Sequence, residues 1–180
     1  FTSTFIHADL NHFLSNAYML LIWGYFCHGH FGPFFYPIGS LFYSAIINLI
    51  TIYTYDNDVK LLGASGLVYF LGGTWMTMFL LIEKQHSFLT RLLKASAVSL
   101  IVFFPSALSP NISYRAHGFG FLFGIVAAFI LYLSSHEKIK MAEIWEQEED
   151  EYEDDFEVNK MTDNGDQTDK TDETDNITYH

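Results

Sequence analysis

Five long apolar runs dominate the chain up to about residue 135. They lie at roughly 10–27, 38–54, 65–82, 92–108 and 117–134, and short segments of glycine, proline and polar residues separate them. Each run approaches the roughly 20 residues that a helix needs to cross a bilayer. The runs are continuous and rich in leucine, isoleucine and phenylalanine, whereas a membrane strand alternates over about ten residues. The sequence therefore predicts an all-α, polytopic membrane helix bundle with five spans.

The composition changes after about residue 135, where acidic residues become frequent. Most of the 21 acidic residues lie beyond this point and account for most of the net charge of −12, so nucleic acid is not an expected partner. Few apolar residues follow Phe156, so this segment is expected to be disordered. We predict a transmembrane domain at 1–135 and an acidic, mostly disordered tail at 136–180, which either keeps the protein soluble or docks a partner.

Basic residues predict how the chain is oriented in the membrane. They cluster between the third and fourth runs and after the fifth run, namely at Lys84, Arg91, Lys94, Lys138 and Lys140. Segments rich in lysine and arginine stay in the cytoplasm, so both should face it. Lys60 and Arg115 fall on the opposite side, against this trend. We expect a multi-pass membrane protein with a cytoplasmic tail, whose first, third and fifth runs begin on the extracytoplasmic side.

The third run opens with small residues around a serine, Gly63-Ala64-Ser65-Gly66. No bulky neighbour in sequence shields the Ser65 hydroxyl. A helix N-terminus has unpaired N–H groups and a partial positive charge, which would stabilise an oxyanion formed next to this serine. Ser65 is therefore a candidate nucleophile. The alternative is that these small residues serve only helix packing, as is common in membranes.

Other unusual polar residues share the predicted depth of Ser65. His12 and Asn16 are four residues apart in the first run, hence on one helical face, and His117 opens the fifth run. Ionisable residues inside a membrane are unfavourable unless they have a function or a partner. These three residues are therefore candidates for the same site.

Glycines predict how His117 and Ser65 meet. Gly120 and Gly124 form a small-xxx-small face on the fifth run, and Gly66 supplies a small position on the third. If the two helices pack through these glycines, the imidazole can reach the serine as a general base. No acidic residue lies near His117 in sequence, so a dyad is expected rather than a triad.

Four patterns occur in order along the chain: His12-x-x-x-Asn16, Gly63-Ala64-Ser65-Gly66, Tyr69, and Ala116-His117-x-x-Gly120-x-x-x-Gly124. Together they resemble the rhomboid family of intramembrane serine proteases, over roughly residues 1–134. The resemblance implies that Ser65 is the nucleophile and His117 the base. It also implies an oxyanion hole of His12, Asn16 and the Ser65 backbone N–H, and a Tyr69 ring stacked on the catalytic imidazole.

The family core has six helices, so the resemblance places a first helix before Phe1. His7 is similar to a further histidine of some members and supports the assignment. The predicted function is cleavage of transmembrane segments of other proteins near the outer membrane face. No cofactor or metal is expected, and the partners are transmembrane substrates and membrane lipid.

Two other functions compete with this prediction. A catalytically silent rhomboid-like protein that binds or sorts membrane clients usually lacks the serine or the histidine, and neither is lost here. A small transporter or channel is disfavoured because the polar residues gather at one end instead of lining a path.

Two further groups of polar residues have simpler interpretations. Cys27-His28-Gly29-His30 has metal-binding spacing, but solvated histidines of an inner loop are expected. Ser44 and Asn48, within the second run, are expected to form interhelical hydrogen bonds.

Overall fold

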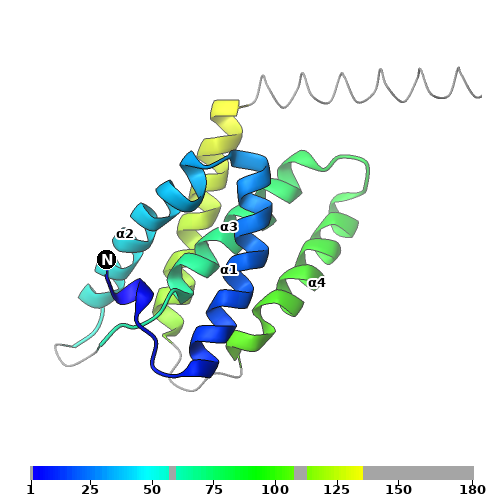
Figure 1. The fold of residues 1–180 in the computed structure, drawn as a ribbon. Coiled ribbons are helices and arrows are strands. Elements are labelled where there is room, and N and C mark those ends of the chain that lie inside the picture. Colours follow the sequence, from blue (N-terminus) through cyan, green and yellow to red (C-terminus); the bar gives the residue numbers. More distant parts are fainter. Residues whose placement is uncertain (1, 57–59, 108–112, 136–180) are drawn as a thin grey trace, which may run out of the picture. The chain divides into compact units, whose positions relative to one another are not determined.

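The computed structural model describes residues 2–56, 60–107 and 113–135. The tail that was predicted to be disordered lies outside these residues. Residues Phe1–Ser134 make one compact unit. Its elements are η1 (Thr2–Phe5), α1 (Leu10–Phe31), η2 (Phe34–Gly39), α2 (Ser40–Tyr53), α3 (Ser65–Ile82), α4 (Phe88–Ala107) and the helix Tyr114–Ser135, here called the His117 helix (Figure 1). The described residues form helices and no strand, which confirms the all-α prediction.

Among the described residues, four helices are long and apolar enough to cross a membrane: Phe34–Tyr53, α3, Phe88–Pro105 and the His117 helix. At 22 residues α1 is long enough, but six polar residues, among them His12 and His30, lower its hydropathy. Its crossing of the membrane stays a prediction. Many large apolar side chains are exposed, including Leu21 and Leu100. Surfaces of this kind are stable against lipid rather than water, so the chain is a membrane protein.

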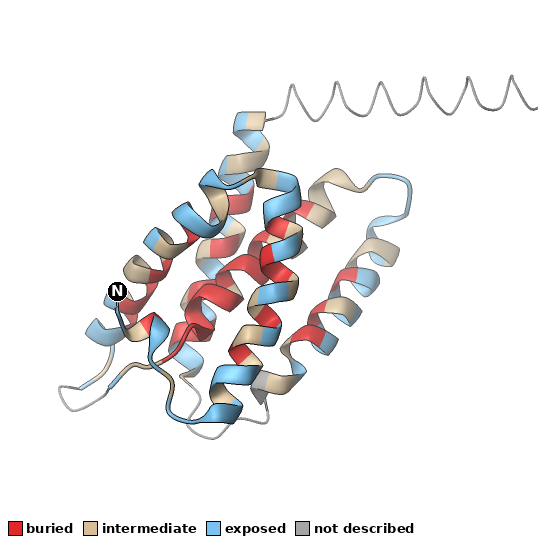
Figure 2. Ribbon diagram, viewed as in Figure 1, coloured by how far each residue is buried: buried red, intermediate tan, exposed pale blue. Residues whose placement is uncertain are grey.

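The core of the bundle lies along α3, which contacts α1, α2 and α4. In α3, 61% of the span is buried, against 11% for α4, so α3 is central and α4 peripheral. Figure 2 shows this as a run of buried residues along α3. Trp23 of α1, Ile47 of α2 and Phe70 of α3 are fully buried in this core.

Local signals explain where the helices begin and end. Asp9 caps α1 by accepting the His12 N–H at 2.8 Å, and Gly32, with φ of 74°, ends α1. The predicted bounds of the third run and α3 agree. The prediction for the first run was too short, because α1 continues to Phe31. His28 therefore lies in the last turn of a helix and not in a loop.

Candidate active site

Ser65 is the first residue of α3 and is buried. The residue before it, Ala64, provides no side-chain cap for the helix. Because the first N–H groups of a helix have no intrahelical acceptor, α3 offers backbone donors and a partial positive charge beside the serine. Gly63 is held in place by its N–H, which donates to the Ser3 carbonyl at 2.9 Å.

The backbone at Gly63 lies against His12 and Asn16. A Cβ built on this glycine would be 2.7 Å from His12 Nε2 and 3.2 Å from Asn16 Nδ2. The φ of 98° also lies in the region that favours glycine. Both observations require glycine here, and they bring the two polar residues of α1 next to the segment that precedes Ser65.

Asn16 is 2% exposed, and within the described part of the chain nothing accepts a hydrogen bond from its Nδ2. Buried amide groups are almost always hydrogen-bonded, so an unpaired donor calls for an explanation. A donor kept unpaired beside a candidate nucleophile is available to a charge that forms only during a reaction.

Two groups lie close to His12. Asp9 accepts its backbone N–H, and the His7 ring lies edge-on at 5.2 Å between centroids. Burial, and then the proximity of His12, lower the pKa of His7, which favours the neutral form of this neighbour. Asp9 was not singled out from the sequence, although aspartate just before an apolar run is a known helix-start signal.

The His117 helix packs directly on α3 through glycines. A Cβ on Gly120 would lie 2.3 Å from the Gly66 carbonyl oxygen, and one on Gly124 would lie 2.2 Å from the Phe70 carbonyl oxygen. Thr74 Oγ1 adds a hydrogen bond to the Gly124 carbonyl at 3.2 Å. Gly120 therefore meets Gly66 backbone against backbone, whereas Gly124 lies against the backbone of Phe70 and Thr74.

His117 is buried, and its ring stacks on Tyr69. The centroids are 4.0 Å apart and the planes 10° from parallel. Tyr69 lies one turn after Ser65, so the imidazole is on the α3 face that carries the serine. The structure thus brings His12, Asn16 and His117 to the end of α3 that carries Ser65 and Tyr69.

Phe103 of α4 covers the other face of the Tyr69 ring, at 4.3 Å between centroids and 15° between planes. His117, Tyr69 and Phe103 therefore form a three-ring stack across three helices. Sequence reasoning missed Phe103, because one phenylalanine in an apolar run carries no signal that distinguishes it from lipid-facing neighbours.

A cavity of about 170 Å³ opens beside this site. Its walls include Thr4, Phe13, Asn16, Leu41, Ala64 and Leu67. The lining is mostly apolar. From α1, the buried amide of Asn16 adds a polar group to it. The cavity can hold a small apolar group next to the backbone that precedes Ser65.

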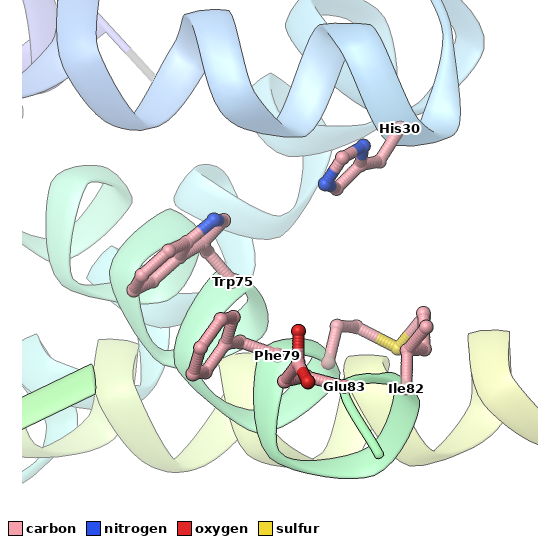
Figure 3. Close-up of a pocket in the computed structure, with 6 residues that line it drawn as sticks. His30, Trp75, Phe79, Ile82 and Glu83 are labelled. Atoms are coloured by element: carbon pink, nitrogen blue, oxygen red, sulfur yellow. The ribbon is translucent and has the colours of Figure 1, made fainter. Parts of the chain in front are cut away.

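A second cavity, of about 200 Å³, lies at the other end of α3 (Figure 3). Trp75 and Phe79 stack at 5.4 Å on one side of it, and His30 lies across from them. Glu83 also lines it, and a hydrogen bond from His86 is the main cause that lowers the pKa of this carboxyl. None of the candidate residues for the Ser65 site lines this cavity.

The interhelical hydrogen bonds expected for Ser44 and Asn48 are present, and their partner is the short helix η1: Ser44 Oγ lies 3.0 Å from Thr4 Oγ1, and Asn48 Nδ2 donates to Ser3 and Thr4. The interpretation of Cys27 needs correction. The Cys27 thiol is buried and donates to the Leu71 carbonyl at 3.6 Å, pointing into the core.

The fold and the site define a class of protein. It is a polytopic helical membrane protein that buries a serine and a histidine in one region of the bundle. The family model for the Rhomboid domain matches residues 1–134, so the chain belongs to the rhomboid family. Comparison with curated proteins and with solved structures found no match. The rhomboid family comprises intramembrane proteases and inactive homologues.

Proposed function

We propose that this protein is an intramembrane serine protease that cleaves transmembrane segments of other membrane proteins. One observation supports this above the others: the His117 imidazole is stacked on Tyr69, one turn along α3 from a buried serine at the helix N-terminus. A nucleophile, a base and an electropositive helix end then occupy one site. Purified protein in liposomes should cleave a transmembrane reporter, and a fluorophosphonate probe should form its adduct on Ser65.

The proposed reaction has two steps. Ser65 Oγ attacks the substrate carbonyl while His117 takes the hydroxyl proton, and the peptide C–N bond breaks as His117 returns that proton to the leaving amine. Water then attacks the acyl-enzyme ester in the same way and releases the new carboxyl terminus. Each tetrahedral intermediate places a negative charge beside the Ser65 N–H, the Asn16 amide and His12.

The substrate must present an extended bond to the serine. A helix has its carbonyls bonded internally, so a transmembrane substrate has to unwind near Ser65 before attack. Small and helix-breaking residues near the substrate's outer end would favour this unwinding. The 170 Å³ cavity suits a small apolar side chain next to the scissile bond.

The Asn16 amide provides a test of the oxyanion hole. Asn16→Ala is expected to lower kcat by on the order of 10²–10³, as removal of one such donor does in soluble serine proteases. The remaining donors, His12 and the Ser65 N–H, limit the loss. Asn11→Ala makes the same change at an exposed position of α1 and should retain wild-type turnover. Unchanged turnover in both Asn16→Ala and His12→Ala would remove these residues from the mechanism.

The proposed orientation has a separate test. We expect the loop after α3 and the acidic tail on the cytoplasmic side, because basic residues flank both. Gln85→Cys and Asn164→Cys, made in a Cys27→Ser background, should then react with an impermeant maleimide from the same side. Cys27 is buried, and serine can keep its bond to the Leu71 carbonyl. Labelling from opposite sides would contradict this topology.

The alternative is a silent homologue that binds membrane clients. It predicts that the wild-type protein retains a transmembrane client in pull-downs but neither cleaves it nor reacts with the probe. Retention of both Ser65 and His117, with an unpaired donor beside them, favours the protease.

A further inference from the structure

A cluster of contacts ties the start of the His117 helix to the end of α2. The Arg115 guanidinium donates to the carbonyl of Thr54, the residue that caps α2, and lies 4.4 Å from the Tyr55 ring centroid. The Tyr55 hydroxyl lies 3.1 Å from Ser113 Oγ, within hydrogen-bond distance. We call these four residues, Thr54, Tyr55, Ser113 and Arg115, the clasp.

The clasp leads directly to the turn that carries the histidine. Ser113 Oγ accepts the Ala116 N–H at 3.3 Å, and the Ser113 carbonyl accepts the His117 N–H at 3.1 Å. Ser113 therefore caps the first turn of the helix and is also the residue that Tyr55 contacts. A shift of Ser113 moves the acceptor of the His117 backbone.

The position of His117 makes such a restraint necessary. His117 is the fourth residue of its helix, and helix ends open more readily than helix centres. The tightest glycine contact that fixes the start of this helix on α3 is at Gly120, further along, and the Ala116 carbonyl lies more loosely against Gly66. On the side of the N-terminus the clasp ties this turn to α2 by hydrogen bonds, and its partners are about 60 residues apart in sequence.

We propose that Arg115 and Tyr55 are positioning residues, which hold the His117 imidazole in its stack on Tyr69 and thereby set turnover rather than substrate affinity. This inference rests on the proposed protease function. Neither residue is expected to touch the reacting atoms. A misplacement of about 1 Å at a catalytic group can cost on the order of 10² in rate, so loosening this turn should be visible in kcat.

The three substitutions should differ in how strongly they lower kcat. Arg115→Ala removes both the ring contact and the carbonyl bond, and should lower kcat on the order of 10-fold with an unchanged KM. Arg115→Lys keeps the charge but loses the planar fork, so it should restore part of this loss. Tyr55→Phe keeps the ring under Arg115 and removes only the hydroxyl, so its effect should be the smallest. In the double variant Arg115→Ala/Tyr55→Phe, the loss of kcat should be smaller than the two single losses combined, because both residues belong to the same cluster of contacts.

The control is Lys60→Ala, which removes another exposed cation near the end of α3 that carries Ser65. Each variant is assayed as full-length protein in liposomes for kcat, KM and the rate of fluorophosphonate labelling of Ser65. Hydrogen exchange of the amides of residues 114–118 reports the same turn without using activity. Arg115→Ala should slow labelling and speed exchange in this segment, whereas Lys60→Ala should match the wild type in both.

The possible results test the positioning role of the clasp separately from the proposed protease function. If the wild type cleaves and labels normally and Arg115→Ala behaves like Lys60→Ala, the clasp is overturned and the protease proposal stands. A rise in KM with kcat unchanged also overturns it, because Arg115 would then bind substrate. If the wild type neither cleaves nor labels, the protease function fails, and the positioning role fails with it.

Discussion

Replacing Ser65 with alanine is expected to lower cleavage of a transmembrane substrate by on the order of 10⁵–10⁶ while the protein stays folded and inserted. In the proposed mechanism the change removes the oxygen that forms the acyl-enzyme ester, and it deletes a single atom from a buried site. Labelling by the fluorophosphonate probe should disappear together with cleavage. Both are measured on full-length protein in liposomes.

His117→Ala should cause a loss of the same order, because the serine hydroxyl is a weak nucleophile without its base. Since the two residues act as a unit, the double variant should be barely worse than either single one. His117→Asn gives a second variant that retains a planar side chain on Tyr69. Thermal unfolding of each variant separates lost chemistry from lost folding.

Ser99→Ala and His30→Ala serve as controls. Ser99 is a buried hydroxyl of α4, and His30 is an exposed imidazole at the far end of α1. Both should keep wild-type turnover. Labelling or cleavage that survives Ser65→Ala would mean that the serine is only a packing residue, and it would favour the client-binding alternative.

Gly124→Ala is expected to reduce both stability and activity strongly. The added Cβ would lie 2.2 Å from the Phe70 carbonyl and 2.8 Å from the Thr74 N, and neither backbone atom can rotate away. The two helices must separate, which overpacking data put at about 1–3 kcal/mol or more. Because His117 is on one helix and Tyr69 on the other, separation also disturbs the stack, and we expect kcat to fall by on the order of 10².

Gly118→Ala is the matched control on the same helix. A Cβ there would meet nothing within 4 Å, and alanine favours helix more than glycine does. This variant should be as active as the wild type and equally or more stable. If Gly124→Ala matched Gly118→Ala in thermal unfolding and cleavage, the close helix contact would not determine the site.

Much of the helix arrangement could be predicted from the apolar runs. The bounds of α3 were predictable because its 18 residues carry no charge and Gly63 with Glu83 flank them closely. The ends of other helices were predicted less accurately. The fourth run was assigned to begin at Leu92, but Ser87 caps α4, with its Oγ accepting the Thr90 N–H at 3.3 Å, and the helix begins at Phe88.

The candidate site could be predicted as far as short-range patterns reach. Ser65 with its small neighbours, and His12 with Asn16 at a four-residue spacing, are visible in the sequence because each pattern lies within one helix. The glycines of the fifth run indicate that another helix packs closely there, since their spacing leaves one face without side chains.

Only the tertiary structure decided which residues from distant parts of the chain touch. Phe103 on Tyr69, Arg115 on Tyr55 and η1 on Asn48 join positions that share no local pattern. Such contacts depend on how helices rotate and cross, and many apolar or polar residues in a run could fill the same place. The sequence alone determined the membrane helices and the chemistry at their ends, whereas packing determined which side chains hold that chemistry in place.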